Sequence, residues 1–172
     1  MKLNANELRE AAPSLRAGQR LLLSGTVYTA RDAAHARIAA VLDSGEAAPF
    51  PLGDAVIYYA GPTPTPEGMP IGSCGPTTSG RMDGFTPRMM DLGVVATIGK
   101  GKRSQEVVDA IVRNRGVYLC ALGGAGALAA ASVASSRVIA YEDLGCESVK
   151  QLELREFPLI VGIDSGGNIL FT

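Results

Sequence analysis

Short apolar runs alternate with amphipathic segments along most of the chain. Apolar runs bounded by glycine, proline or polar residues predict strands at residues 21–29, 55–60, 94–98, 117–122, 136–141 and 159–163. Apolar residues that recur every three or four positions predict helices at 31–43, from 86 to just before Gly93, and from about 105 to 112. Because strands alternate with helices, we expect an α/β domain with parallel pairing.

Turn-forming residues divide these elements. The helix at 31–43 is expected to stop near Gly45, and the prolines of 61–70 predict a rigid loop. A tight Gly123-Gly124 turn and a small-residue helix should follow the strand at 117–122. Residues 159–163, a turn at 164–168 and residues 169–171 predict a closing hairpin, which makes the sheet mixed.

The length and charge of the chain narrow its class. With 172 residues and no internal repeat, we expect one domain over residues 1–172, in which 1–20 form a polar lead-in. A net charge of −1 argues against nucleic acid as a main partner. The basic cluster of Lys100, Lys102 and Arg103 is short and lacks aromatic neighbours. We expect no signal peptide, because the first residues lack an apolar core after their charge, and residues 117–134 look too broken to span a bilayer.

Three cysteines at wide spacing give no disulfide framework and fit a reducing cytoplasm. They form no zinc or cluster motif by themselves. Cys120 lies in an apolar strand and is expected to be a small core residue. Cys74 lies in the glycine-rich segment described next, where a structural role is favoured over a reactive thiol.

Residues 71–85 combine glycines, a proline, hydroxyl side chains and Arg81 in a turn-forming segment. Glycines let the backbone approach a ligand closely, and hydroxyls and arginine donate directed hydrogen bonds. Arg31 and Lys100 each lie between a predicted strand and a predicted helix, where helix N-termini attract anions. We therefore expect Arg31, Arg81 and Lys100 to converge on a small dicarboxylate.

Five segments carry a family resemblance, which runs from about Leu21 to the C-terminus. They are Thr29-Ala-Arg-Asp-Ala-Ala-His35, Gly61-Pro-Thr63, Gly75-Pro-Thr-Thr-Ser-Gly-Arg-Met-Asp83, Lys100-Gly-Lys-Arg-Ser104 and Tyr141-Glu-Asp-Leu-Gly145. The chain resembles the β subunit of iron–sulfur hydro-lyases, which include class I fumarase and L(+)-tartrate dehydratase.

The resemblance implies a compact swivelling β/β/α domain with a mixed central sheet flanked by helices. It implies reversible addition of water to a small dicarboxylate, either fumarate/malate or tartrate/oxaloacetate. It also implies a [4Fe–4S] cluster that a separate α subunit ligates, with no metal held by this chain, in a cytoplasmic assembly of two α and two β subunits.

The resemblance also assigns roles to individual residues. It implies that Thr77 acts in proton transfer, that Arg31 and Arg81 bind substrate carboxylates, and that Lys100 binds substrate or stabilises developing charge. A threonine hydroxyl is a weak base, so Thr77 needs a carboxylate, which the family supplies from the other subunit.

Each of these residues also has a plainer interpretation. Arg31 beside Asp32 suits a surface ion pair, and Thr77 and Thr78 suit a turn or a cap. His35, the sole histidine, is an acid–base candidate but is favoured as a structural hydrogen-bonder.

Two acidic segments are interpreted as structural. Asp83 is expected to orient its loop, through Arg81. Glu142 and Asp143 are expected in a turn that fixes a strand end.

Two other functions remain open at this point. A non-catalytic dicarboxylate-binding module would carry the same cations. A scaffold that only stabilises a partner is disfavoured, because it would not need Thr77, Arg81 and Lys100 together.

Overall fold

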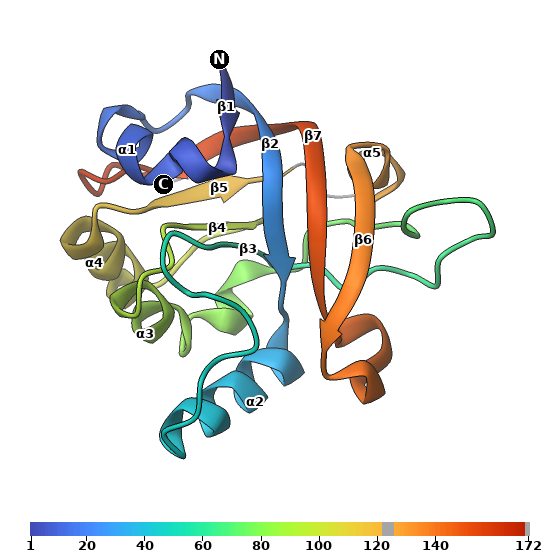
Figure 1. The fold of residues 1–172 in the computed structure, drawn as a ribbon. Coiled ribbons are helices and arrows are strands. Elements are labelled where there is room, and N and C mark those ends of the chain that lie inside the picture. Colours follow the sequence, from blue (N-terminus) through green and yellow to red (C-terminus); the bar gives the residue numbers. More distant parts are fainter. Residues whose placement is uncertain (122–125, 171–172) are drawn as a thin grey trace.

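The computed structural model describes residues 1–121 and 126–170, and it contains a seven-stranded sheet in the order β1-β2-β3-β4-β5-β7-β6. An additional pairing of β2 with β7 closes five strands into a ring (Figure 1). The strands are β1 (Lys2–Asn4), β2 (Arg20–Thr29), β3 (Val56–Tyr58), β4 (Ala96–Gly99), β5 (Val117–Cys120), β6 (Val133–Ala140) and β7 (Val149–Ile163).

Strands β1 to β5 pair in parallel, as the alternating pattern predicts. Every residue of β3, β4 and β5 is buried, which explains why these strands are continuous apolar runs rather than alternating ones. The α/β class, the mixed sheet and the flanking helices are confirmed.

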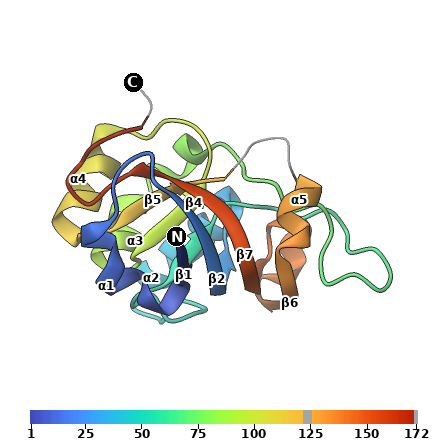
Figure 2. The same cartoon turned by 90° about the horizontal axis from the view of Figure 1, so that it is seen from above.

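The mixed character has a different origin from the one expected. Strand β7 is antiparallel to β2, β5 and β6, so the chain's last long strand makes the sheet mixed. It begins at Val149, ten residues before the predicted strand at 159–163. Figure 2 shows β2 and β7 running side by side over the top of the molecule. β6 likewise begins earlier than predicted, at Val133.

Four α-helices cover the ring besides the N-terminal α1: α2 (Asp32–Asp43), α3 (Thr86–Asp91), α4 (Gln105–Asn114) and α5 (Gly126–Ala131). Helix α2 buries Ala34 and Ile38 in a cluster with Ile57 and Tyr59 of the sheet. Helix α4 packs its apolar face against Tyr118 and Ile163. The predicted helices at 31–43, 86–92 and 105–112 are therefore present; α2 follows the end of β2, α4 follows the end of β4, and α3 follows the 3-10 helix at Ser79–Met82.

The expected polar lead-in at 1–20 is instead part of the structured body. It contains β1, the 3-10 helices η1 (Ala5–Glu7) and η2 (Ala12–Ser14), and α1 (Leu8–Ala11). A capping box between Asn4 and Glu7 starts the turn, and Leu8 and Leu15 are completely buried in the core. The many polar residues of this segment obscure, in the sequence, the few apolar residues that face the core.

The turn at residues 164–168 is confirmed. The buried Asp164 carboxylate accepts backbone N–H groups of Ala17, Gly166 and Asn168, and a bridge joins Ile163 to Ile169. Burial opposes ionisation, but these donors outweigh it and hold the pKa of Asp164 below its usual value. Residue 171 of the expected hairpin, residue 122 and the Gly123-Gly124 turn lie outside the described residues.

Within the described residues, no helix is both long and apolar enough to cross a bilayer.

Candidate active site

The carboxyl ends of the parallel strands β2, β3 and β4 meet at one edge of the sheet, and the predicted site residues gather there. Arg31 follows β2, and Lys100 follows β4. The segment after β3 returns to the same edge through a bridge between Ala60 and Pro76. In open α/β sheets this edge is where ligands bind, because loops and helix N-termini converge on it.

Thr77 and Thr78 are fixed by backbone contacts to two strand ends. The Thr77 N–H donates to the Tyr59 carbonyl at 2.8 Å, and Thr78 forms a parallel bridge with Lys100. The Ser79 N–H donates to the Lys100 carbonyl at 2.9 Å. Thr77 and Thr78 therefore lie beside Lys100 although more than twenty residues separate them in sequence.

A close approach at Gly99 makes this pairing possible. A Cβ at Gly99 would lie 1.9 Å from the Ser79 Oγ, so only glycine fits. The buried Ser79 hydroxyl in turn shares a 2.9 Å hydrogen bond with the Tyr118 hydroxyl. The close contact of Gly99, at the end of β4, with Ser79 therefore sets the position of the segment that contains Thr77 and Thr78.

Arg31 caps α2 and places a partly buried guanidinium at the same edge. Its side chain is 22% exposed, and its Nε lies 3.9 Å from carboxylate oxygens of both Asp32 and Glu147. Among the residues that the structure describes, its Nε has no hydrogen-bond partner. A Cβ at Gly61 would lie 2.8 Å from Arg31 Nη1, so glycine makes room for the guanidinium. Arg31 is therefore held by packing against Gly61 and by the flanking charges of Asp32 and Glu147.

Arg81 reaches the same place from the 3-10 helix η3 (Ser79–Met82). Its Nε donates to Asp32 Oδ1 at 3.0 Å, and its side chain is 52% exposed. Asp32 therefore contacts both arginines. The expected Arg31–Asp32 ion pair is long, whereas the hydrogen bond that Asp32 accepts comes from Arg81.

Asp83 orients its loop through Arg103, and not through Arg81 as expected. Its carboxylate accepts from Arg103 Nε at 2.7 Å and from the Ser104 N–H at 2.6 Å. The Arg103 side chain has no exposed surface, and its guanidinium also donates to Thr97 and Thr86. Asp83, whose side chain is 16% exposed, thus anchors the buried Arg103 behind the site.

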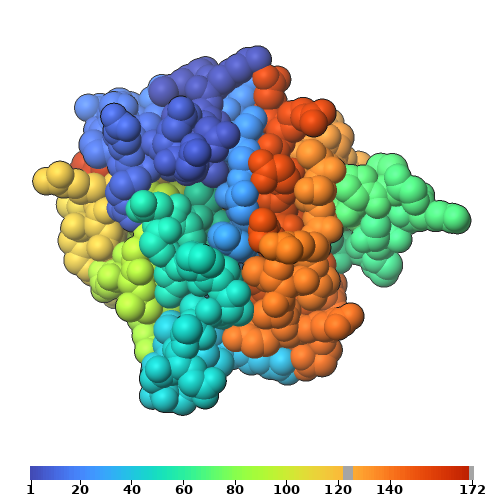
Figure 3. Space-filling view, viewed as in Figure 1, coloured from blue at the N-terminus to red at the C-terminus, as the bar shows by residue number. Residues whose placement is uncertain are grey.

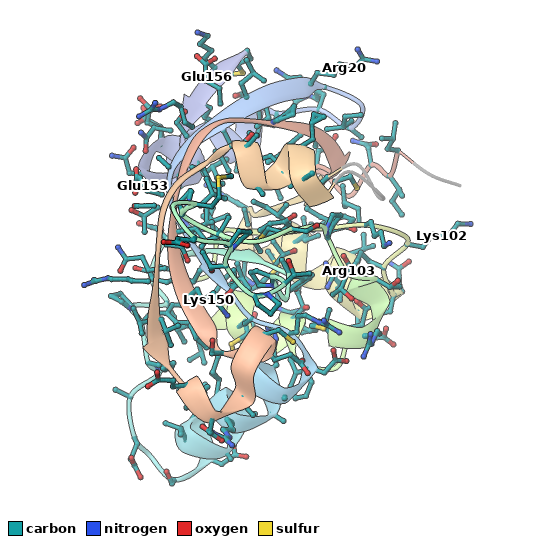
Figure 4. All side chains as sticks on the ribbon, turned by 90° about the vertical axis from the view of Figure 1, so that its right-hand side faces the viewer. Arg20, Lys102, Arg103, Lys150, Glu153 and Glu156 are labelled. Carbon is teal, nitrogen blue, oxygen red and sulfur yellow. The ribbon has the colours of Figure 1, made fainter. Side chains whose placement is uncertain are left out.

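The three residues of the basic cluster, Lys100, Lys102 and Arg103, therefore differ in their exposure to solvent. In Figure 4, Lys102 extends away from the body, whereas Arg103 lies inside it. Arg103 stacks over the rings of Tyr59 and Tyr118, with its Cζ 5.3 and 4.8 Å from their centroids. Lys100, the third residue of the cluster, is half-buried.

His35 is completely buried behind Arg31. Its Nδ1 lies 2.8 Å from the Arg31 carbonyl, so Nδ1 carries the proton and donates it there, while Nε2 has no partner. The ring lies 5.5 Å from Phe85 and 5.6 Å from Tyr59, centroid to centroid. Burial lowers the His35 pKa to about 4, so the imidazole is neutral. This geometry matches the favoured structural role.

Burial of Cys74 and Cys120 disfavours the thiolate form of both side chains. Burial raises the Cys74 pKa to about 12 and also raises that of Cys120. Cys146 is exposed. Among the residues that the structure describes, no three His, Cys, Asp or Glu side chains gather as a metal site. Cys74 has the environment of a structural thiol.

The segment between β3 and η3 projects from the body on the side of β6 (Figure 3). Its base is closed by the Thr63 N–H to the Ser73 carbonyl and by the Ser73 N–H to Thr63 Oγ1. Residues 63–70 are exposed, as the proline-rich pattern indicated. This projecting segment borders the site on one side.

Sequence reasoning missed three residues that shape the site: Asp32 as a shared carboxylate, Glu147 beside Arg31, and Arg103 as a buried anchor. Asp32 was visible only as a neighbour of Arg31. Glu147 and Arg103 gave no signal, because their partners are distant in sequence.

The fold and site define an α/β protein with two arginines and a lysine at the carboxyl edge of its sheet, a setting for a small anion. Over residues 1–172 the chain matches the model of the family described as Fumarase C-terminus. The chain belongs to this family, and the resemblance seen in its motifs is confirmed.

Three relatives illustrate the range of the family. Fumarate hydratase 2 of Leishmania major is 38% identical over 174 residues, which cover 100% of this chain and 31% of that protein. The aerobic class I fumarate hydratase of Escherichia coli (strain K12) is 42% identical over 154 residues, 88% of this chain and 28% of that protein. The protein named "Putative L(+)-tartrate dehydratase subunit beta" of Methanocaldococcus jannaschii is 38% identical over 178 residues, 99% of this chain and 91% of that protein. The chain thus spans about a third of the fumarate hydratases and nearly all of the Methanocaldococcus protein.

Proposed function

We propose that the chain is the β-type part of a hydro-lyase that reversibly adds water to a small dicarboxylate. The substrate pair is fumarate/malate or tartrate/oxaloacetate, or a methylated relative. The observation that carries this proposal is the Arg31 guanidinium, which is seated against Gly61 and, within the described residues, has no hydrogen bond at Nε. Asp32 joins it to Arg81, and Lys100 follows a neighbouring strand at the same edge of the sheet. The names of the fumarate hydratases and of the tartrate dehydratase subunit support the same reaction class.

Arg31, Arg81 and Lys100 bind the two carboxylates of the substrate. An arginine fork donates two parallel hydrogen bonds to a carboxylate, and each charge-assisted bond contributes about 1.5–3 kcal/mol. Arg31 has the more fixed position because it is mostly buried, and Arg81 has the more open one. Lys100 also stabilises the negative charge that develops when a proton leaves carbon.

Thr77 moves the proton. Its backbone is held to the Tyr59 carbonyl, next to the bridge of Thr78 with Lys100, and we propose that the Lys100 charge stabilises the alkoxide electrostatically. Because the hydroxyl alone is a weak base, we propose that a carboxylate of the partner completes this step. Thr78, His35 and Asp83 support the site: Thr78 pairs with Lys100, His35 fixes the Arg31 carbonyl, and Asp83 fixes Arg103.

We propose that a separate α subunit ligates a [4Fe–4S] cluster and covers this edge, in a cytoplasmic assembly of two α and two β subunits. The relative named as a β subunit supports this division. When bound, the cluster supplies a Lewis acid that polarises the substrate hydroxyl. This chain supplies the cations and the threonine.

The alternative is a dicarboxylate-binding module without catalysis, which the same cations would serve. The test is anaerobic assay of the purified chain alone and of the chain reconstituted with the α-type protein, against fumarate, malate, tartrate, oxaloacetate and a methylated analogue. We expect a folded, colourless, inactive chain and an active complex. A chain that alone shows a [4Fe–4S] absorption band and hydrates fumarate contradicts the two-subunit proposal. Stoichiometric dicarboxylate binding with an inactive complex favours the binding module.

A further inference from the structure

The carboxylate of Asp32 lies between two guanidinium groups that come from different elements. Oδ1 accepts a 3.0 Å hydrogen bond from Arg81 Nε, and Oδ2 lies 3.9 Å from Arg31 Nε. Asp32 is the first residue of α2, where the helix dipole favours a negative charge. One side chain thus connects the cap of α2 to η3.

Asp32 contacts each arginine at its Nε and leaves the terminal nitrogens uncovered. A guanidinium has five N–H donors, so a bond at Nε leaves the terminal pair for a second, bidentate partner. Within residues 1–121 and 126–170, the terminal nitrogens of Arg81 make no hydrogen bond. We propose that Asp32 is a positioning residue that fixes the stem of Arg81 and presents its terminal N–H pair to a substrate carboxylate. This rests on the proposed function, because it names a further residue of the same site.

Charge repulsion makes such a residue necessary. Three positive charges meet at one edge of the sheet, those of Arg31, Arg81 and Lys100. The Arg81 side chain can turn away into solvent more easily than that of Arg31, because it is 52% exposed and the Arg31 side chain is 22% exposed. Without a carboxylate between them, Arg81 would turn into solvent, where its charge is hydrated. Asp32 therefore keeps the two arginines close enough to serve one small dianion.

The contact differs from an ordinary surface ion pair. Asp43, in the last turn of the same helix, pairs with Arg88 at 2.7 Å, and both side chains are well exposed. Such pairs contribute little. Asp32 is only 35% exposed, serves two cations, and has an Oδ2 that is buried without a hydrogen bond. A buried acceptor without a partner is costly, so stability alone does not explain this arrangement.

The first measurement is made on the full chain by NMR, without a ligand. The Arg81 Nε–H signal, assigned by its absence in Arg81→Lys, should be protected from solvent exchange in the parent and in Asp32→Asn, which keeps an acceptor oxygen. Asp32→Ala should lose this protection, and Asp43→Ala should not. An Arg81 signal that is indifferent to Asp32→Ala overturns the proposal.

The second measurement is kinetic, on the chain assembled with its cluster-bearing partner. Asp32→Ala should raise KM for the dicarboxylate about tenfold, the value of one modest hydrogen bond, while kcat changes less than about threefold. Asp32→Asn should restore KM to within about threefold, and Asp43→Ala should match the parent. Equal KM values for Asp32→Ala and Asp43→Ala overturn the proposal.

The two measurements separate the two claims. If the parental assembly hydrates no dicarboxylate of the panel, the proposed function fails, and the Arg81 signal still decides the role of Asp32. If the assembly is active and Asp32→Ala changes neither readout, the proposed function stands and the positioning role fails. Thermal midpoints of all variants identify any change that comes from unfolding.

Discussion

Replacing Asp83 by alanine tests the buried anchor behind the site. The change leaves the Arg103 guanidinium, which has no exposed side-chain surface, without its carboxylate. It also removes the acceptor of the Ser104 N–H, next to the start of α4. Arg103 keeps its hydrogen bonds to Thr97 and Thr86, which soften the loss but do not neutralise the charge.

The magnitude follows from these contacts. Removing one partner of a buried ion pair costs about 3–5 kcal/mol. The lost acceptor at the helix start adds about 1 kcal/mol. The hydrogen bonds that remain and the two aromatic rings near Arg103 place the expected loss near the lower end, about 3 kcal/mol. In a domain of this size, that lowers the thermal midpoint by about 6–12 °C.

Urea unfolding and calorimetry measure the loss, and two further variants interpret it. Asp143→Ala breaks the exposed pair with Arg37 and should leave the midpoint nearly unchanged. Asp83→Ala combined with Arg103→Met should be more stable than Asp83→Ala alone, because no buried charge is left unpaired. The reasoning is refuted if Asp83→Ala is as mild as Asp143→Ala, or if the double variant is the less stable one.

Three further predictions concern the site itself. Arg81→Lys keeps the charge but loses the bidentate fork, so the assembled enzyme should lose about 2–4 kcal/mol of transition-state stabilisation in kcat/KM; near-parental kinetics would place Arg81 outside the substrate contacts. Thr77→Val should stop exchange of the substrate C–H proton with deuterated solvent, while Thr78→Val should not, and the reverse pattern would contradict the assignment. The His35 pKa, about 4 against 6.5 in the unfolded chain, means that the unfolded state binds more protons in this window, so stability should fall by about 3 kcal/mol from pH 6.5 to 4. Unfolding free energies across this range should fall less steeply in His35→Gln, and parallel slopes would show that His35 is not buried as a neutral ring.

The placement of Arg31 and Lys100 at one edge of the sheet was predictable because it obeys a rule of topology. Arg31 and Lys100 follow strands that read as buried and parallel, and the carboxyl ends of such strands share an edge. Local pattern alone therefore places both cations together. The segment of Thr77 and Arg81 was placed there by its composition, and the bridge between Thr78 and Lys100 is the contact that brings it in.

Other features escaped because their causes are tertiary. Strand β7 contains Pro158 and a positive φ of 49° at Glu156, which interrupt the pattern of an ordinary strand, yet its pairing with β2, β5 and β6 holds it extended. Arg103 reads as one of three clustered surface cations until Asp83 and the rings of Tyr59 and Tyr118 enclose it. No local signal predicts a partner that is twenty residues away.

The closure of the strand ring has a consequence for synthesis of the chain. Strand β2 precedes β7 in the chain, so one of its two edges is completed only after β7, the last of the seven strands, has been made. Glu147, which flanks Arg31, emerges just before β7. Ordering such distant segments carries a large entropic cost until both are available, so the native edge should form only after translation of the domain is nearly complete. A partner that recognises the carboxyl edge of the sheet, where Arg31 lies, would therefore bind only domains in which β7 is in place. Truncated chains, in which β2 lacks its β7 neighbour, would be left to proteolysis.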